Sequence, residues 1–536
     1  MAFVFKLLSR CLLPTTYSLQ PNFMNPIVLL ILDGWGIAPA SKGNAIEAAK
    51  KPHFDKLWDK YPHTTLDASG KHVGLPVGWV GNSEAGHANI GAGRIVKDDM
   101  VTIFEDIANG RFQKNLALNQ TIDFVLKNRS HLHVMGMASD GQSPHSSLEH
   151  LDAIVDLSAA RGVKEVYLHL FTDGRDAPQF NAIKVVGDIT KRVTGKAKIV
   201  SLIGRFYAMD RGKNWDRTKQ AYDCLTGVDS LCFGMPEEAI LHAYNKKITD
   251  EYIEPSIIAA TRRARRQTRI QDNDGVIFFN ARSDRARQLT KCFVQKEFNK
   301  LNPGSFRRAV VAQNTMFCAL TDFGPDLDHI VTAYPAAALK ETLPHVLQSL
   351  KQVYIAETEK YAHMTYFING GSADPVNGEL RVRVPSPIVK SYAQKPEMSV
   401  RAVTKETLRF LREKFNFIGV NFANPDMVGH TGDMAAVIKA VEAVDDCLGA
   451  VARAVIKAKG SLIVIGDHGN AEKMFDLETG EIWTGHTTNP VPFLLIDDER
   501  RGIKLHCGAL FNVAPTVYDI FGFRKLPDIL HKSLIK

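Results

Sequence analysis

Three apolar runs that each lead into an aspartate constrain the fold of this chain more than any other feature. They are residues 26–32 before Asp33, residues 417–422 before Asp426 and residues 461–465 before Asp467. Short uninterrupted apolar runs bounded by turn residues are typical of buried parallel strands with helices on both faces. Because ligands bind beyond the carboxyl ends of such strands, we expect the three carboxylates to converge at one edge of an α/β sheet.

Histidines accompany these carboxylates. Asp426 and His430 lie four residues apart, so one helical turn would place both side chains on the same face. His468 directly follows Asp467, and His486 comes soon afterwards. Aspartate and histidine side chains without cysteine suit Mn²⁺, Zn²⁺ or Mg²⁺. The pattern therefore predicts a metal site.

A serine joins this group. Ser83 lies between Gly81 and Gly86 in a turn-like segment, which makes its hydroxyl a candidate nucleophile. The candidate ligands are too many for one tetrahedral ion and about right for two: Asp33, Ser83, Asp426, His430, Asp467, His468 and His486. Each residue taken alone could instead be a helix cap, a turn residue or a solvated histidine. Their recurrence in the same context favours two metal ions.

The composition indicates a folded chain in a reducing compartment. Of its 536 residues, 45% are apolar and 23% are charged, which is ordinary for a soluble globular protein. The seven cysteines form no Cys-x-x-Cys pair, which favours the cytoplasm and argues against a zinc ribbon. The sequence contains no run of about 18 apolar residues, so we expect no transmembrane helix. We interpret residues 1–23 as an extension left by an upstream start, with a short targeting segment as the alternative.

The net charge of +8 leaves several classes of partner open, from nucleic acid and acidic membranes to small anions. The densest basic run, residues 262–266, has no interleaved aromatic residues. We therefore interpret it as a solvated helix face or loop rather than a nucleic-acid site, with weak phosphate-backbone binding as the alternative. We expect a small-molecule partner, no nucleic acid and no membrane.

The candidate ligands fall in two blocks, residues 33–83 and residues 426–486, which predicts one sheet domain interrupted by a long insertion. We expect a metal-binding domain of residues 24–97 and 333–536 and an inserted domain of residues 98–332. Within the insertion, further apolar runs end in polar turns at residues 131–136, 166–171, 199–203 and 275–279. The inserted domain is therefore predicted to be α/β as well.

In the inserted domain, arginines follow the predicted strands, whereas in the metal-binding domain aspartates follow them. The arginines are Arg175, Arg205, Arg211, Arg282 and Arg285. A guanidinium fork matches carboxylate and phosphate groups, so these arginines predict a site for a small phosphorylated acid. Each one alone is more often a surface salt-bridge partner, for example of Asp176, Asp210 or Asp284. Their common position favours the binding site.

Seven short motifs run in order along nearly the whole chain. They are DGWG at residues 33–36, GNSE at 81–84, DGRD at 173–176, GRFYAMDR at 204–211, NPDMVGH at 424–430, DHGN at 467–470 and HTTNP at 486–490. Together they resemble the cofactor-independent phosphoglycerate mutases of the alkaline phosphatase superfamily. The resemblance implies a phosphatase-like three-layer sheet domain interrupted by an inserted α/β phosphotransferase domain. It also implies two divalent ions, most often Mn²⁺ with Mg²⁺, Co²⁺ or Zn²⁺ as alternatives, and no bisphosphoglycerate.

The resemblance also assigns roles by position. Asp33, Ser83, Asp467 and His468 would bind one ion, and Asp426, His430 and His486 the other. Ser83 would accept the phosphoryl group. The residues implied to contact the substrate are His145, Arg175, Asp176, Arg205, Arg211, Arg282, Arg285 and Lys360, the last also as a catalytic residue. The segment that carries His145 departs from the family pattern, because it is one residue longer.

The implied activity is the interconversion of 2-phosphoglycerate and 3-phosphoglycerate in glycolysis and gluconeogenesis, through a phosphoserine at Ser83. A phosphatase or a phosphopentomutase of the same superfamily is the nearest alternative. The latter is disfavoured because serine, not threonine, occupies the nucleophile position. A noncatalytic protein that binds phosphoproteins or nucleic acid is the alternative from another class, and the intact ligands argue against it. We expect a monomeric cytoplasmic enzyme.

Overall fold

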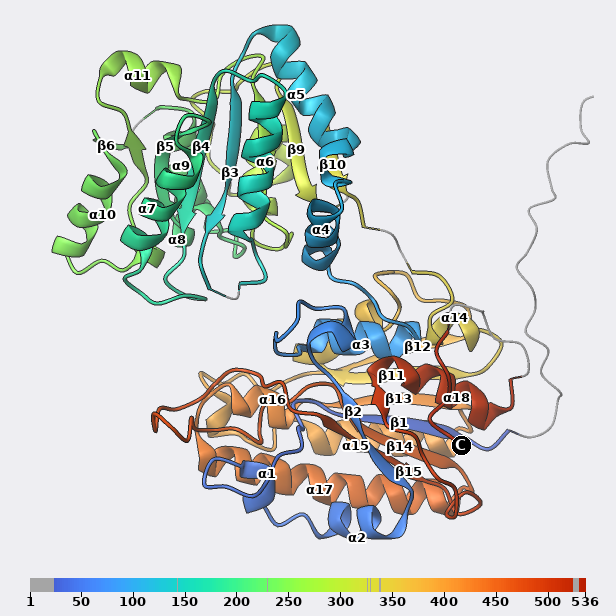
Figure 1. Cartoon of the computed structure of the whole chain (residues 1–536). Coiled ribbons are helices and arrows are strands. Elements are labelled where there is room, and N and C mark those ends of the chain that lie inside the picture. Colours follow the sequence, from blue (N-terminus) through green and yellow to red (C-terminus); the bar gives the residue numbers. More distant parts are fainter. Residues whose placement is uncertain are drawn as a thin grey trace, which may run out of the picture. The chain divides into compact units, whose positions relative to one another are not determined.

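The computed structural model describes residues 24–141, 143–228, 230–324, 326–327, 329–336, 339–523 and 530–536. The predicted N-terminal extension, residues 1–23, lies outside them. The chain divides into two compact units. One holds the described residues up to Lys97 together with those from Ala337 to Lys536, and the other holds Asp98–Ala336. The divisions predicted from the sequence fall after residues 97 and 332, so the first is the same and the second lies four residues earlier. Figure 1 shows both units, coloured along the chain.

The first unit is built on an eight-stranded sheet with the order β12-β11-β13-β1-β14-β15-β2-β16. Its strands are β1 (Ile27–Leu32), β2 (His63–Asp67), β11 (Gln352–Glu357), β12 (Glu379–Val384), β13 (Phe417–Phe422), β14 (Ser461–Gly466), β15 (Val491–Ile496) and β16 (Gly508–Ala509). The neighbours β12, β11, β13, β1 and β14 run parallel, whereas β15 is antiparallel to both of its neighbours. The three apolar runs, which were predicted to be buried parallel strands, are β1, β13 and β14, and they lie next to one another in the sheet.

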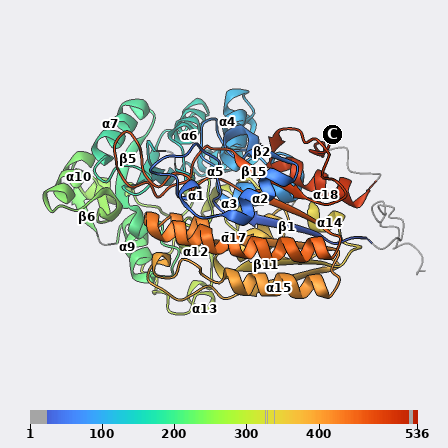
Figure 2. The same ribbon diagram turned by 90° about the horizontal axis from the view of Figure 1, so that it is seen from below.

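Helices cover both faces of this sheet, which explains why the runs are apolar without interruption. The main ones are α2 (Pro52–Lys60), α3 (Ser83–Ala92), α14 (Leu343–Val346), α15 (Val400–Arg412), α16 (Asn424–Gly429), α17 (Met434–Lys457) and α18 (Val513–Phe521). Alternate residues of β1 enter separate cores, Val28 and Leu30 with α15 and α17, and Leu29 and Ile31 with α3, α14 and α18. Figure 2 shows α15 and α17 side by side along this unit.

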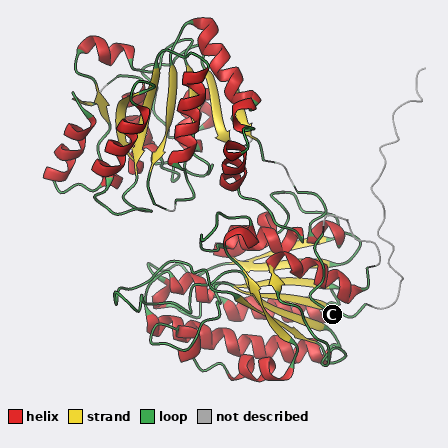
Figure 3. Ribbon diagram, in the orientation of Figure 1, coloured by secondary structure: helices red, strands yellow, loops and turns green. Residues whose placement is uncertain are grey.

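The second unit repeats this architecture around the sheet β10-β9-β8-β3-β4-β5-β7-β6. Its strands are β3 (Leu132–Ala138), β4 (Val166–Thr172), β5 (Lys198–Gly204), β6 (Leu231–Phe233), β7 (Ser256–Ile258), β8 (Gly275–Phe278), β9 (Met316–Thr321) and β10 (Ile330–Tyr334). One face packs on α5 (Leu116–Asn128), α6 (Leu148–Ala160), α7 (Ala182–Val193) and α10 (Pro236–Asn245), and the other on α9 (Trp215–Leu225) and α12 (Arg287–Val294). Figure 3 shows helices on both sides of each sheet, and the predicted α/β class is confirmed.

Within the part of the chain that the structure describes, no helix is long and apolar enough to cross a membrane. The six cysteines that the structure describes all carry free thiols. The basic run forms the short helix α11 (Arg262–Gln267), which buries none of its residues.

Candidate functional site

Neighbouring strands of the first unit bring the predicted ligands to one sheet edge. In register, the end of β1 lies beside the ends of β13 and β14. Asp33 follows β1 directly, Asp467 follows β14, Asp426 lies in α16 after β13, and Lys360 lies in the turn after β11. His486 precedes β15, which begins at this edge because it is antiparallel. The order and direction of the strands therefore bring together residues that are far apart in the sequence.

The turn after β1 requires a glycine. Gly34 has a φ angle of +74°, and a Cβ atom there would lie 2.8 Å from the Cα atom of Asp426. Its backbone N–H donates a 3.1 Å hydrogen bond to Oδ1 of Asp467. Because Gly34 permits this close passage, the chain brings Asp33, Asp426 and Asp467 together.

Ser83 is the first residue of α3, and the start of the helix fixes its position. Asn82 caps the helix, since its side-chain oxygen accepts a 2.8 Å hydrogen bond from the N–H of Ala85. The hydroxyl oxygen of Ser83 lies 2.9 Å from Nε2 of His468 and 2.7 Å from Nζ of Lys360. The positive end of the helix dipole adds to the charge of Lys360, so the environment of the hydroxyl favours an anion.

Three histidines turn Nε2 toward one carboxylate oxygen. Oδ1 of Asp426 lies 3.2 Å from Nε2 of His486, 3.3 Å from that of His430 and 3.9 Å from that of His468. The other ring nitrogen, Nδ1, faces a backbone carbonyl in each case: Gly81 for His486, Thr484 for His430 and Gly469 for His468. A carbonyl only accepts, so Nδ1 carries the hydrogen and Nε2 presents a lone pair.

These lone pairs converge with no hydrogen between them. The Nε2 atoms of His430 and His486 are 3.2 Å apart, and both face the carboxylate of Asp426. Lone pairs and a carboxylate oxygen at such distances repel one another unless a cation lies among them. A divalent metal would supply that cation, and a proton on one ring would compete with it.

The carboxylates of this site outnumber the ammonium group that lies among them. Nζ of Lys360 lies 2.6 Å from Oδ1 of Asp33 and 2.6 Å from Oδ2 of Asp426. Burial raises the pKa of Asp33 to about 6, and the nearby charge of Asp467 adds to the rise. Burial opposes the charge of Lys360, yet the carboxylates of Asp33 and Asp426 hold its pKa above the ordinary value. The remaining negative charge is what a dication would offset.

The pKa values of two histidines near these charges are shifted in opposite directions. Burial lowers the pKa of His468 to about 3, so its ring stays neutral near pH 7. Burial also opposes charge on His430, but the neighbouring carboxylate of Asp426 favours the protonated ring and raises its pKa above the ordinary value. Nε2 of His468 lies 3.6 Å from Oδ1 of Asp33 and 3.9 Å from Oδ1 of Asp426. His468 therefore faces a predicted ligand of each ion.

The donor atoms fit divalent metals. Two groups place their ligand atoms within 4.8 Å of one another: Asp426 with His468 and His486, and Asp33 with His87 and Asp467. Oδ2 of Asp467 is buried and has no hydrogen-bond partner among the described residues. Carboxylate oxygens together with imidazole nitrogens suit Mn²⁺, Co²⁺ or Zn²⁺.

Two asparagines that the sequence analysis missed hold the carboxylates in place. Nδ2 of Asn421 donates to Oδ2 of Asp33 at 2.7 Å, and Nδ2 of Asn470 donates to Oδ1 of Asp426 at 3.0 Å. Asn421 could have been found, because it is a polar residue inside the apolar run of β13. Asn470 lies in the DHGN motif, and nothing in its sequence position indicated which carboxylate it bonds.

Two buried ionisable residues were also missed. His87 lies four residues after Ser83 in α3, so both lie on the same face of the helix. Glu472 accepts hydrogen bonds from the backbone N–H groups of Gly36 and Asn470 at 3.2 and 2.8 Å. Glu472 ties together the loops that follow β1 and β14, which carry the ligands.

The predicted arginines of the second unit gather at the carboxyl ends of neighbouring strands. Arg175 follows β4, Arg205 and Arg211 follow β5, and Arg282 and Arg285 follow β8. Burial lowers the pKa of Arg285, and the positive charges of Arg205, Arg211 and Arg175 lower it further. The crowding of guanidinium groups concentrates positive charge at this edge, which would favour an anion there.

Arg205 is buried and held by two aspartates. Its Nη1 lies 2.6 Å from Oδ1 of Asp173 and 2.9 Å from Oδ2 of Asp176. His145 is buried nearby, and its Nδ1 has no hydrogen-bond partner among the described residues. Burial and the charge of Arg205 lower the pKa of His145 to about 4. The longer segment around His145 therefore still brings this ring to the arginine edge.

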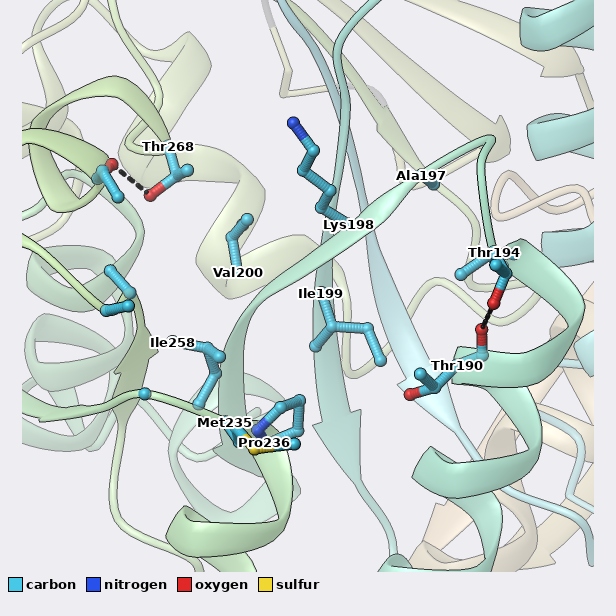
Figure 4. Close-up of a pocket in the computed structure, with 15 residues that line it drawn as sticks. Thr190, Thr194, Ala197, Lys198, Ile199, Val200, Met235, Pro236, Ile258 and Thr268 are labelled. Atoms are coloured by element: carbon cyan, nitrogen blue, oxygen red, sulfur yellow. Dashed lines mark hydrogen bonds between the residues drawn. The ribbon is translucent and has the colours of Figure 1, made fainter.

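A pocket of about 350 Å³ in the second unit lies elsewhere (Figure 4). It opens at the amino end of β5, between α7, α10 and α11, whereas Arg205 follows the carboxyl end of β5. Its described lining includes neither an acid nor a histidine. Lys198 is paired with Glu165, and the hydroxyls of Thr194 and Thr268 bond backbone carbonyls. These groups favour neither a metal nor a phosphate there.

Comparisons with known proteins find relatives along almost the whole chain. Residues 25–525 match the model of the metalloenzyme superfamily. A protein of Moorella thermoacetica named 2,3-bisphosphoglycerate-independent phosphoglycerate mutase is 45% identical over 95% of this chain and 98% of its own length. A protein of the same name from Methanococcoides burtonii is 43% identical over 95% of this chain and 98% of its own. The solved phosphoglycerate mutase of Leishmania mexicana, described at low cobalt concentration, superposes with a TM-score of 0.77 at 28% identity, over 97% of this chain and 100% of that one.

Proposed function

This chain belongs to the 2,3-bisphosphoglycerate-independent phosphoglycerate mutases of the metalloenzyme superfamily, and we propose that it interconverts 2-phosphoglycerate and 3-phosphoglycerate through a phosphorylated Ser83. The observation that supports this chemistry most directly is the position of the Ser83 hydroxyl. Its oxygen lies 2.7 Å from the ammonium of Lys360 and 2.9 Å from the neutral ring of His468.

Ser83 acts as the nucleophile in this proposal. A serine hydroxyl is a poor nucleophile while it keeps its proton, so its surroundings must favour proton loss. Lys360, whose ammonium lies 2.7 Å from the hydroxyl oxygen, stabilises the negative charge that proton loss leaves on that oxygen. The first turn of α3 adds its dipole to the same effect.

Lys360 has a second role once the phosphoryl group is transferred. Phosphoryl transfer depends mainly on positioning and on stabilising charge at the phosphoryl oxygens. A buried ammonium that is already fixed by Asp33 and Asp426 needs no rearrangement when that charge arrives. We therefore propose that Lys360 contacts the phosphoryl group in both directions of the reaction.

Two divalent ions complete the site in this proposal, and we propose Mn²⁺ for both. One would be held by Asp33, Ser83, Asp467 and His468, the other by Asp426, His430 and His486. When bound, the ions would favour loss of the Ser83 proton and offset charge on the phosphoryl group. The inward lone pairs of His430 and His486 and the unpaired oxygen of Asp467 support this assignment.

The arginines of the second unit bind the substrate in this proposal. Arg175, Arg205, Arg211, Arg282 and Arg285 would hold the carboxylate and phosphate groups of the glycerate, since guanidinium donors match both. A mutase has to retain the dephosphorylated glycerate until the phosphoryl group returns to its other hydroxyl. A cluster of arginines retains it through the carboxylate, which does not change during the reaction. We propose the cytoplasm as the compartment, which the free cysteines support.

An assay of the purified protein with 3-phosphoglycerate tests this function. We expect 2-phosphoglycerate to form with Mn²⁺ and without bisphosphoglycerate, EDTA to abolish the activity, and Mn²⁺ to restore it. Activity that required bisphosphoglycerate, or that survived complete removal of metal, would contradict the proposal. Free phosphate released in place of 2-phosphoglycerate would indicate a phosphatase.

A further inference from the structure

His87 occupies an unusual position beside the candidate site. It is completely buried, one turn after Ser83 in α3. Its Nδ1 lies 2.9 Å from the carbonyl oxygen of Ser83 and 3.4 Å from Oδ2 of Asp467. The ring of His363 packs against it with 5.5 Å between ring centres. The position of this imidazole is thus fixed by its helix, by polar contacts and by a neighbouring ring.

The hydrogen bonds of His87 determine which of its nitrogens carries the hydrogen. The carbonyl of Ser83 only accepts, so Nδ1 of His87 is the donor. Nε2 of His87 lies 3.1 Å from Nδ2 of Asn421, an amide nitrogen that donates. The same Nδ2 donates to Oδ2 of Asp33, which agrees with its assignment as a nitrogen. Both ring nitrogens of His87 are therefore engaged.

This arrangement distinguishes His87 from His430 and His486. Among the described residues, their Nε2 atoms present lone pairs with no donor opposite, as metal ligands do, whereas Nε2 of His87 already accepts a hydrogen bond. His87 lies close enough to Asp33 and Asp467 to form a three-ligand group by distance alone. Its engaged nitrogens argue against that role.

The hydrogen bonds form a chain from the backbone of Ser83 to the carboxylate of Asp33. It runs from the Ser83 carbonyl through His87 and Asn421 to Oδ2 of Asp33. The other oxygen of that carboxylate, Oδ1, lies 3.3 Å from the Ser83 hydroxyl and 2.6 Å from Nζ of Lys360. Because Asn421 holds Oδ2, Oδ1 is the oxygen that remains for the reacting side of the site.

We propose that His87 is a positioning residue that acts through Asn421 to orient the Asp33 carboxylate toward Ser83 and its metal ion. The inference rests on the proposed function, since it assigns His87 a task in phosphoryl transfer at Ser83. Residues that orient metal ligands in this way usually affect metal affinity or activity by about 10- to 100-fold. Substrate binding by the arginines is not expected to depend on His87.

The test compares His87→Ala with His150→Ala. Both remove a buried imidazole from a helix, but neither ring nitrogen of His150 has a hydrogen-bond partner among the described residues. We expect His87→Ala to lower kcat and Mn²⁺ affinity by about 10- to 100-fold, with KM nearly unchanged. His150→Ala should keep wild-type kcat and Mn²⁺ affinity. Steady-state kinetics and electron paramagnetic resonance of free Mn²⁺ measure these quantities.

A double-mutant cycle with Asn421→Ala tests the chain itself. If His87 acts through Asn421, the double variant should lose no more kcat than the more impaired single variant. Additive losses would overturn the proposal, as would a His87→Ala variant with wild-type kcat and Mn²⁺ affinity. Wild-type protein that failed to convert 3-phosphoglycerate would instead overturn the proposed function.

His87→Asn provides a second variant if thermal unfolding shows that His87→Ala does not fold. An asparagine side chain can place an N–H group near the position of Nδ1, so it can keep the bond to the Ser83 carbonyl. It cannot reach Asn421 as Nε2 does. We expect a folded protein with lowered kcat and Mn²⁺ affinity, and wild-type values in this variant would overturn the proposal.

Discussion

The ammonium nitrogen of Lys360 lies 2.7 Å from the hydroxyl oxygen of Ser83. The same nitrogen lies 2.6 Å from a carboxylate oxygen of Asp33 and 2.6 Å from one of Asp426. An ammonium group has three hydrogens, and these three acceptors use all of them, which fixes its position. The positive charge is therefore in place before any phosphoryl group reaches Ser83.

Replacing Lys360 with methionine removes this charge and keeps most of the side chain's length. We expect kcat to fall by about 100- to 1000-fold, as when one preorganised donor is removed from an active site. The affinity for Mn²⁺ should not fall, because the carboxylates lose a competing cation. Steady-state kinetics and a Mn²⁺ titration measure both effects.

The matched control for this variant is Lys351→Met, since Lys351 is an exposed lysine of the same unit. It should leave both quantities unchanged. If Lys360→Met kept wild-type kcat, the assigned role of the ammonium would be wrong. A parallel loss of Mn²⁺ affinity would show that Lys360 supports the metals rather than the phosphoryl group.

Metal affinity should depend on pH through His430. The carboxylate of Asp426 favours the protonated ring, which overcomes the effect of burial and raises the pKa of His430 above the ordinary 6.5, so protons compete for Nε2 at and above that pH. We expect the apparent affinity for Mn²⁺ to fall as the pH is lowered from 8 to about 6. His468, with a pKa of about 3, should not contribute in this range. Calorimetric titration at several pH values measures the effect, and affinity independent of pH would argue against His430 as a ligand.

Removing Arg285 should weaken substrate binding. Its guanidinium lies in a crowded positive cluster, so an anionic substrate relieves repulsion there as well as accepting hydrogen bonds. A hydrogen bond to a charged group contributes about 1.5–3 kcal/mol, so Arg285→Met should raise KM for 3-phosphoglycerate by about 10- to 100-fold. Arg287→Met is the control, because Arg287 is paired with Asp326. Equal KM values for the two variants would show that Arg285 does not bind the substrate.

The stability of the second unit should depend on Asp274. This buried carboxylate lies 3.1 Å from Nε2 of His133 and 3.3 Å from Nδ1 of His131, and it accepts the backbone N–H groups of His131 and Gln271 at 2.9 Å each. We expect Asp274→Ala to lower the free energy of unfolding by about 3 kcal/mol in urea titrations. Asp272→Ala, at an exposed position, should cost less than about 1 kcal/mol.

The pH dependence of this effect has a definite sign. Burial opposes ionisation of Asp274, but its bonds from His131 and His133 hold its pKa below the ordinary 3.8. Its contribution is therefore fully present above the unfolded-state pKa and is lost as the pH falls through the lowered folded-state value. As the pH falls below about 4, the stability difference between wild type and Asp274→Ala should shrink. A difference that grew in acid would contradict the assigned direction.

The aspartates of the site could be predicted from sequence because their positions follow from the backbone. An apolar run long enough for one buried strand ends at the sheet edge, so Asp33 and Asp467 had to lie at that edge if the strands were parallel neighbours. His486 reaches the same edge because β15 is antiparallel to β14, and nothing in the sequence indicated the direction of that strand.

The ring orientations could not be predicted in this way. Nδ1 of His430 bonds the carbonyl of Thr484, and Nδ1 of His486 bonds that of Gly81, in segments far away along the chain. These contacts decide which nitrogen faces Asp426, and they exist only once the loops have packed. His87 was missed for a related reason, because its helical spacing from Ser83 indicated proximity but not its bond to Asn421.

Detection of phosphate on Ser83 tests the central claim most directly. The protein is mixed with Mn²⁺ and 3-phosphoglycerate, quenched in acid within milliseconds, and analysed by peptide mass spectrometry. We predict that the peptide containing Ser83 carries one phosphoryl group, and that Ser83→Ala is inactive and carries none. Rapid conversion of 3-phosphoglycerate by Ser83→Ala, or turnover by the wild type with no phosphate on Ser83 at any quench time, would contradict the account.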